Sequence, residues 1–96
     1  MKRRQILVAY DIADDKRRTS VYKRLIDEGE RLQYSVFLCE TTATERTRLE
    51  AELESLIHHN EDQIVLLDLG PDPTMLEHAL TTIGKPWNPP SRVQII

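Results

Sequence analysis

The chain has 96 residues, of which 40% are hydrophobic, and its formal net charge is −3 at pH 7. This length corresponds to one domain. No run approaches the roughly 18 apolar residues of a membrane span, so we expect a soluble, cytoplasmic protein with no membrane contact. The single cysteine, Cys39, excludes an internal disulfide framework and a thiolate zinc cluster.

The charge is distributed unevenly along the chain. Residues 1–31 hold nine Lys or Arg against six acidic residues, whereas residues 32–96 hold four against ten. A basic first third predicts a phosphate-binding face, because the local field rather than the total charge steers an anion. A solvated surface with uneven charge is the alternative interpretation.

The first elements predicted along the chain are a strand and a helix. The nearly continuous apolar run from Gln5 to Ile12 is typical of a central strand. Ala13–Asp15 breaks the run and offers N-cap residues, and a helix is predicted from there to Glu28, with Gly29 after its end. Helical spacing gives this helix a buried stripe of Val21, Tyr22, Leu25 and Ile26.

Arg18 falls near the middle of that buried stripe. An unpaired buried guanidinium is costly, so Arg18 must reach solvent or meet an anion. We expect either an ion pair with Asp11, at the end of the preceding strand, or contact with a phosphate group. The two interpretations are compatible if the pair belongs to a binding site.

Residues 31–40 form a second extended segment, which is either one long kinked strand or two short ones. Alternation places Tyr34, Val36 and Leu38 on one face and Gln33, Ser35, Phe37 and Cys39 on the other. Arg31 and two polar residues within a half-buried strand are unusual unless the segment has a functional role.

The remaining elements complete an alternation of strands and helices. Thr42 and Glu45 match a capping box for a helix to His58, and an apolar strand is predicted over residues 63–69. Thr74 is expected to cap a short helix. The proline-rich residues 84–90 form a stiff connector to a terminal strand, 92–96, which pairs with its own sheet or with a neighbouring chain.

This order of elements predicts an α+β, ferredoxin-like βαββαβ sandwich with an extra C-terminal strand. Residues 1–84 would form the ferredoxin-like domain. Residues 85–96 would form a proline-rich arm and a strand at a dimer interface.

Asp11 is the candidate metal ligand. Magnesium takes oxygen ligands and is often held by one or two carboxylates, together with waters and substrate phosphates. One Asp per chain is little for this purpose, but a two-fold dimer that brought the first strands together would supply two. A purely structural role for Asp11 is the alternative.

Several motifs occur together at specific spacing. Tyr10-Asp11-Ile12 is followed by Asp14-Asp15, then by Arg17-Arg18, and then by the run from Gly29 to Phe37. This pattern, over roughly residues 5–40, resembles the CRISPR-associated Cas-two family. The order of the later elements and the chain length agree with that family.

The resemblance implies a homodimer in which the first strands of two protomers face each other. Asp11 and its symmetry mate would flank one divalent cation, usually taken as Mg2+, that activates water for phosphodiester cleavage. Tyr10 is the second residue implied in catalysis. The residues implied in nucleic-acid binding or in support of the site are Arg17, Arg18, Arg31, Ser35 and Phe37.

Members of this family are described both as metal-dependent nucleases and as part of the spacer-acquisition complex. The resemblance therefore implies a CRISPR spacer-acquisition subunit that acts with the integrase subunit and has magnesium-dependent endonuclease activity on RNA or DNA. The acidic second half suggests that a basic partner supplies much of the nucleic-acid contact. The alternatives are a ferredoxin-like ribonuclease toxin and a non-catalytic nucleic-acid-binding scaffold.

Overall fold

The computed structural model describes residues 2–87. Strands and helices alternate along the chain, as the sequence predicts. The elements are β1 (Arg4–Asp11), α1 (Asp15–Glu28), β2 (Gly29–Gln33), β3 (Val36–Thr41), α2 (Ala43–Leu56), β4 (Gln63–Gly70) and α3 (Met75–Ala79).

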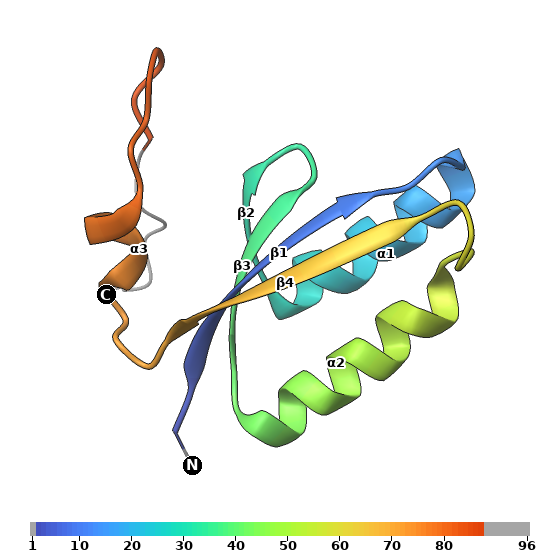
Figure 1. The fold of residues 1–96 in the computed structure, drawn as a ribbon, viewed down its shortest axis with the longest axis horizontal. Coiled ribbons are helices and arrows are strands. Elements are labelled where there is room, and N and C mark those ends of the chain that lie inside the picture. Colours follow the sequence, from blue (N-terminus) through green and yellow to red (C-terminus); the bar gives the residue numbers. More distant parts are fainter. Residues whose placement is uncertain (1, 88–96) are drawn as a thin grey trace.

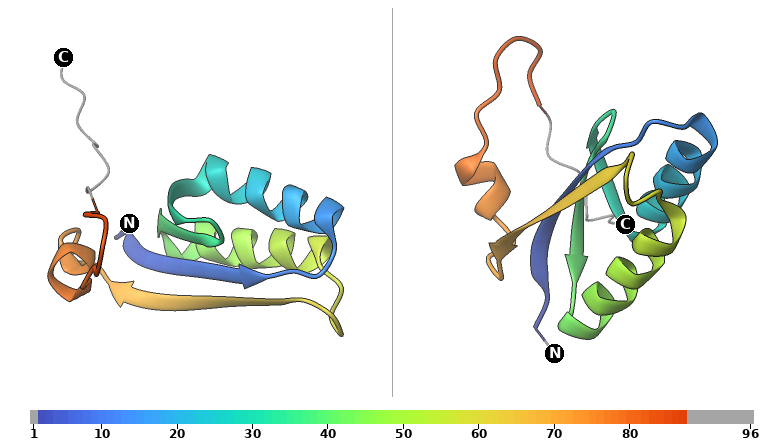
Figure 2. Two further views of the ribbon diagram at one scale, coloured as in Figure 1. Left: turned by 90° about the horizontal axis from the view of Figure 1, so that it is seen from above. Right: turned by 45° about the vertical axis from the view of Figure 1, so that its right-hand side comes forward.

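The strands form one antiparallel sheet in the order β2-β3-β1-β4. Both long helices, α1 and α2, cover the same face of this sheet (Figure 1). Neither of them lies on the other face. Figure 2 shows the two layers from the side. The predicted ferredoxin-like βαββαβ arrangement is confirmed, and β1 is central because it pairs with both β3 and β4.

The core lies between the two helices and the sheet. Every second residue of β1 points into it, because side chains alternate between the faces of a strand. α1 and α2 each contribute two fully or almost fully buried residues, and β3 contributes Phe37 and Cys39, both fully buried. The main members are Ile6, Val8, Tyr10, Val21, Leu25, Phe37, Cys39, Leu49 and Leu53. Burial raises the pKa of the Cys39 thiol to about 12.

One residue of the predicted buried stripe in α1 is misplaced. Val21 and Leu25 are buried, but Ile26 is 42% exposed. The buried stripe of α1 is therefore narrower than predicted, because Ile26 lies at its edge on the solvent side.

The long helices begin at the predicted caps. The Asp14 carboxylate accepts a hydrogen bond from the backbone N–H of Arg17, and Thr42 and Glu45 form the complete capping box. The end predicted for α2 at His58 is wrong by two residues, since the helix stops at Leu56.

Thr74 is the N-cap residue of α3, as predicted, but its side chain makes no cap hydrogen bond. Instead, the carboxylate of Asp72 accepts from both the backbone N–H and the hydroxyl of Thr74, at 2.9 and 2.8 Å. An Asx turn before the helix therefore takes the place of the expected side-chain cap hydrogen bond.

Gly29 ends α1 but does not adopt the left-handed conformation common after helices. Its φ is −158°, and the chain passes directly from the helix into β2. A Cβ at this position would overlap the carbonyl oxygen of Leu38 and lie 2.8 Å from the Cα of Cys39. Glycine is therefore required by the close approach of two backbones rather than by a positive φ.

The extended segment around residues 31–40 is a hairpin of two strands. A turn at Tyr34 and Ser35 separates β2 from β3, and the β2–β3 register shifts between Arg31 and Gln33. The turn interrupts the simple alternation. After it, Phe37 and Cys39 share the helix-covered face as predicted.

α3 lies beyond the end of β4 and does not join the layer formed by α1 and α2 (Figures 1 and 2). The predicted strand over residues 92–96 falls outside the described residues. Within residues 2–87, no helix is long and apolar enough to cross a membrane.

Candidate functional site

Two neighbouring residues of β1, Tyr10 and Asp11, point to opposite sides of the sheet. Tyr10 is 7% exposed and belongs to the core on the helix-covered face. Asp11 is exposed at the last position of the strand, where it pairs in register with Gln63 of β4. Among the described residues, its carboxylate has no hydrogen bond or ion pair. The oxygens of Asp11 are therefore available to an external cation.

The backbone immediately after Asp11 is held in place by two charged side chains. Arg18 donates to the carbonyl oxygen of Ile12 at 2.9 Å, and the Asp62 carboxylate accepts from the N–H of Ala13 at 3.0 Å. These contacts connect the end of β1 to α1 and to the residue preceding β4. They hold the backbone that follows Asp11 in one position.

Arg17 is engaged by carboxylates. It donates to Asp62 through Nε at 2.7 Å and Nη2 at 3.2 Å, and to Glu61 at 3.1 Å. The Asp62 side chain is fully buried and also accepts from the N–H of His58. The Arg17 guanidinium is the main cause that holds the pKa of Asp62 well below its usual range. The nucleic-acid role predicted for Arg17 stays a prediction, and the contacts present are structural.

The ion pair predicted between Arg18 and Asp11 is wrong. Arg18 pairs with Asp15, three residues earlier on α1, as well as with the carbonyl oxygen of Ile12. Asp11 points to the open face, so the two side chains are not directed toward each other. The Asp15 carboxylate is 92% exposed, which makes it a weak and replaceable partner.

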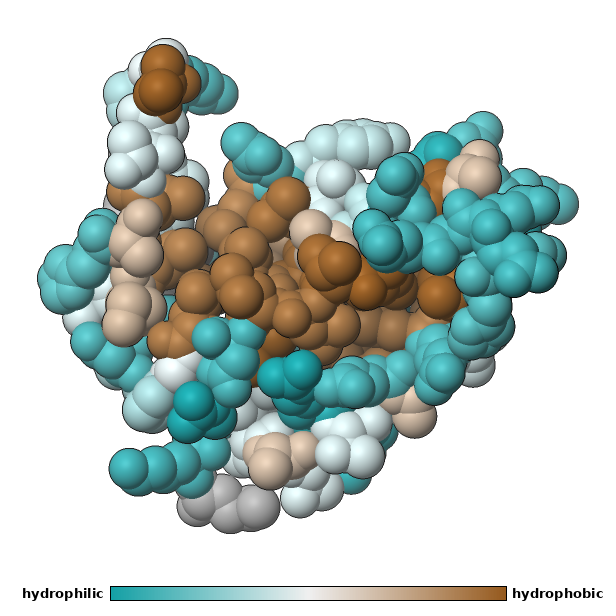
Figure 3. Space-filling view, viewed as in Figure 1, coloured by the Kyte–Doolittle hydropathy of each residue, from teal (hydrophilic) through white to brown (hydrophobic). Residues whose placement is uncertain are grey.

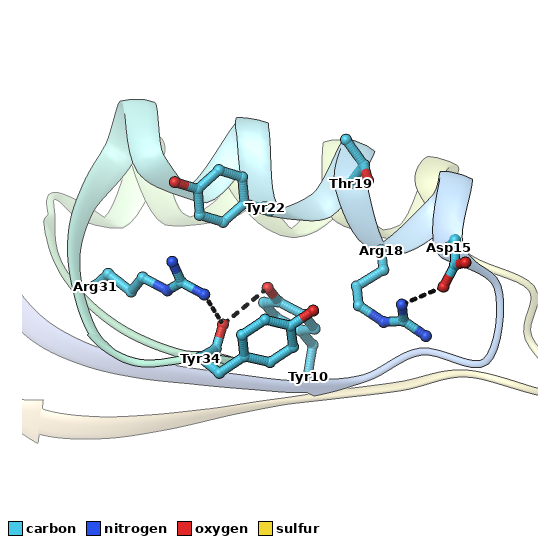
Figure 4. Close-up of a pocket in the computed structure, with 7 residues that line it drawn as sticks. All are labelled: Tyr10, Asp15, Arg18, Thr19, Tyr22, Arg31 and Tyr34. Atoms are coloured by element: carbon cyan, nitrogen blue, oxygen red, sulfur yellow. Dashed lines mark hydrogen bonds and ion pairs between the residues drawn. The ribbon is translucent and has the colours of Figure 1, made fainter.

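A cleft of about 440 Å³ opens beside Arg18 on the helix-covered side of β1 (Figure 4). Its walls come from α1, from the end of β1 and from the β2–β3 hairpin. Positive and aromatic side chains dominate the lining, which consists of Tyr10, Asp15, Arg18, Thr19, Tyr22, Arg31 and Tyr34.

Arg31 lines this cleft and lies between two aromatic rings. Its guanidinium carbon lies 5.1 Å from the ring centroids of both Tyr22 and Tyr34. It also donates to the carbonyl oxygen of Tyr34 at 3.1 Å. Cation–π contacts on both sides hold the planar cation in one orientation. This preorganisation suits the binding of a planar or anionic group.

The Tyr10 hydroxyl donates to the same Tyr34 carbonyl oxygen at 3.3 Å. Burial, partly opposed by the charge of Arg31, raises the pKa of Tyr10 above its ordinary value. The phenol is therefore protonated near neutral pH and acts as a hydrogen-bond donor. Its predicted catalytic role stays a prediction.

Phe37 and Ser35 contact residues that line the cleft. The Phe37 ring contacts those of Tyr10 and Tyr22, at centroid distances of 6.3 and 5.9 Å. The carbonyl oxygen of Ser35 accepts from the backbone N–H of Tyr10 at 3.0 Å. Both residues therefore fix the position of Tyr10, Phe37 by its ring and Ser35 by its backbone.

The face of the sheet opposite the helices is apolar. Leu7 pairs across the sheet with Leu38 and Leu67, and the next row is formed by Ala9 with its two neighbours, Val36 and Val65. Val65 and Leu67 remain 50% and 55% exposed. A hydrophobic surface bordered by polar residues is visible over the sheet in Figure 3. Such a surface on a small protein is typical of an association interface.

The donor set for a metal is incomplete within one chain. In residues 2–87, no three His, Cys, Asp or Glu side chains are grouped so as to hold a metal ion. The Asp11 carboxylate nevertheless offers the oxygen ligands that Mg2+ prefers, and no cation within residues 2–87 neutralises it. The residues present fit a magnesium site only if two copies of Asp11 share the ion.

The sequence does not identify three residues of the site: Asp62, Tyr22 and Tyr34. Asp62 is isolated from the other site residues along the chain, and only the pairing of β1 with β4 brings it next to Ala13. Tyr22 was assigned to the core stripe and Tyr34 only to a strand face. The repeated tyrosines near Arg31 were the available signal.

The fold and the site together define a small ferredoxin-like α+β protein with an exposed aspartate at the end of its central strand and an arginine–tyrosine cleft beside it. The family described as CRISPR associated protein Cas2 matches residues 4–73. The chain therefore belongs to the Cas2 family.

Individual relatives agree with this assignment. The chain is 38% identical over 90 residues to "CRISPR-associated endoribonuclease Cas2 1" of Rhodospirillum rubrum, covering 94% of this chain and 87% of that protein. It resembles the crystal structure of Streptococcus pyogenes Cas2 with a TM-score of 0.73 and 30% identity, covering 83% and 99% of the two chains. It also resembles a chain of a "Partial Cas6-RT-Cas1--Cas2 complex", with a TM-score of 0.65, 26% identity and coverage of 81% and 89%.

Proposed function

We propose that this chain is a CRISPR spacer-acquisition subunit that acts with the Cas1 integrase as a homodimer and carries magnesium-dependent endonuclease activity. Membership of the Cas2 family and the similarity to a chain of a complex named for both Cas1 and Cas2 support the first part. The free carboxylate of Asp11 at the rim of an apolar sheet face is the observation that supports the second.

The dimer would form through the open face of the sheet. Burial of the rows around Leu7 and Ala9, together with exposed Val65 and Leu67, would remove apolar surface from water. Asp11 ends the same β1 row, so a two-fold axis near the end of β1 would bring two carboxylates together.

The roles of the protein's own residues follow from this arrangement. The paired Asp11 side chains would bind Mg2+, and the ion would act as a Lewis acid toward water and a phosphodiester. The contacts of Arg18 and Asp62 with the backbone hold the two carboxylates in place. Arg18 and Arg31 would attract the phosphate backbone of the nucleic acid.

The substrate of hydrolysis is proposed to be RNA. The relative from Rhodospirillum rubrum is named as an endoribonuclease, which favours RNA phosphodiesters over DNA. DNA would instead be the nucleic acid held together with the integrase.

A scaffold without catalysis is the second candidate function. It is favoured because, among the described residues, Asp11 is the only candidate metal ligand proposed at the end of β1, and because residues 2–87 contain no group of three possible metal ligands. A scaffold would use the dimer and the cationic cleft but would not need Asp11 to bind a cation.

Asp11→Asn separates the two functions, because it preserves size and removes the charge that binds the cation. We expect magnesium-dependent RNA cleavage to fall at least about 100-fold, since even the loss of a residue that only supports a metal ligand costs 10- to 100-fold. Assembly with the integrase and spacer insertion are expected to persist. Cleavage rates, assembly on a sizing column and insertion assays measure these outcomes.

Asp27→Asn on α1 is the matched control, because Asp27 is also an exposed aspartate and lies outside the site. It should leave cleavage unchanged. Full cleavage by the Asp11 variant in the presence of a chelator would contradict the proposed chemistry. Loss of assembly in that variant would show instead that Asp11 is structural.

A further inference from the structure

We infer that the arginine–tyrosine cleft binds one unpaired nucleotide of a nucleic-acid strand, with its base against Tyr34 and its phosphate at Arg18. This inference rests on the proposed function, because it requires that the chain binds nucleic acid. It adds a binding site on the helix-covered side of β1, away from the face that carries Asp11.

The outer wall of the cleft is an exposed aromatic ring. Tyr34 lies in the hairpin turn and is 69% exposed, so its ring is accessible from solvent. Arg31 covers the inner side of its ring at 5.1 Å. An unstacked base can pack on a tyrosine ring or on a guanidinium plane, whereas a base inside a duplex cannot reach either.

The cations of the cleft retain binding capacity for a phosphate. Among the described residues, Arg31 has one hydrogen-bond acceptor, the Tyr34 carbonyl oxygen, and the rest of its five donors are available. The carboxylate partner of Arg18 is Asp15, which is 92% exposed. A phosphate can replace this partner without uncovering a buried charge. The exposed Thr19 adds a hydroxyl at the same wall.

The dimensions of the cleft favour a single nucleotide. Its volume of about 440 Å³ is within the range of sites that hold one small ligand. Figure 4 shows that Tyr22 and Arg18 project from α1 toward the hairpin, so the cleft is bounded on two sides. A strand entering it must therefore be unpaired, as at a single-stranded tail or a splayed end.

The position of the cleft determines where a bound nucleic-acid strand would run relative to Asp11. Tyr10 lines the cleft while Asp11, the next residue, points to the opposite side of the sheet. A nucleotide held in the cleft is therefore offset from the phosphodiester at Asp11. The cleft would anchor a strand rather than take part in its cleavage.

The test compares oligonucleotide duplexes with and without a single-stranded tail, at one salt concentration, with 2-aminopurine as a fluorescent base in the tail. Tyr34→Leu removes the aromatic ring but retains apolar bulk. We expect it to weaken binding of the tailed duplex roughly 10-fold and to abolish the fluorescence quenching caused by stacking. Binding of the blunt duplex should not change. Tyr34→Phe should restore both the affinity and the quenching.

Arg31→Lys provides a second variant, because it retains the charge but loses the planar stack. We expect a selective loss for the tailed duplex, whereas the control Arg46→Lys on α2 should have no such effect. Equal losses for tailed and blunt duplexes, or unchanged quenching in Tyr34→Leu, would overturn the inference and leave the proposed function intact. Failure of the unmodified protein to bind any duplex would overturn both.

Discussion

The two faces of the sheet differ although the same strand supplies both. On the helix-covered face, Ile6, Val8 and Tyr10 of β1 are 7% exposed or less. On the open face, Leu7 and Ala9 are half-buried and Asp11 is exposed. Alternation along one strand thus places one set of residues in the core of the monomer and leaves the other set on the open face, where we propose that association and chemistry take place.

The difference also separates the two candidate sites. The arginine–tyrosine cleft is attached to the core through Phe37, which contacts Tyr10 and Tyr22. In the part of the chain that the structure describes, Asp11 has no such contact, and its position depends on the backbone that follows it. Substitutions on the helix-covered face should therefore affect folding and ligand binding in the cleft. Substitutions on the open face should affect dimer formation and cation binding at Asp11.

The largest expected effect is on the helix-covered face. Phe37→Ala should lower the free energy of unfolding by about 3–5 kcal/mol, because it removes a fully buried ring and leaves a cavity. Urea denaturation of the monomer would measure this. Val65→Ala on the half-exposed open face is the control and should cost less than about 1 kcal/mol. Equal losses of unfolding free energy in the two variants would show that the helix-covered face does not contribute more to stability than the open face.

An intermediate effect is expected from a charge on the open face. Leu67→Glu would place two carboxylates in a symmetric apolar interface, so the dissociation constant of the dimer should rise about 100-fold, or about 2.7 kcal/mol. Sedimentation over a range of concentrations measures it. Circular dichroism should show an unchanged fold, since Leu67 is 55% exposed in the monomer.

Ala51→Glu on α2 adds the same charge at an exposed position on the helix side. It should leave the dimer unchanged. A dimer that persists in Leu67→Glu would place the interface elsewhere than on the open face.

The smallest expected effect concerns pH and the contact between the ends of β1 and α2. The pKa of Asp62 is lowered in the folded state, so its stabilising contribution is present above the ordinary aspartate pKa and is lost as the pH falls below it. Asp62→Asn should be less stable than the unmodified protein at pH 7, and this difference should shrink below about pH 4. Urea unfolding at both pH values is the measurement. A stability difference between the two proteins that grows as the pH falls would contradict the lowered pKa of Asp62.

Much of the fold was predictable because its signals are local. The apolar run of β1, the Asp14 cap and the capping box of Thr42 and Glu45 depend on residues a few positions apart. The burial predicted for Ile26 is wrong for the opposite reason, because its exposure depends on how α1 packs on the sheet.

The sequence by itself determined the order of elements, the family and the choice of Asp11 as candidate ligand, because these follow from residue type and spacing within one segment. Only the tertiary structure decided that Asp11 points away from Arg18, that Asp62 binds Arg17, and that the cleft and Asp11 lie on opposite sides of β1. Contacts of this kind join residues distant in sequence or depend on the orientation of a strand in the sheet. Their partners are set by sheet register and helix packing, which no local pattern encodes.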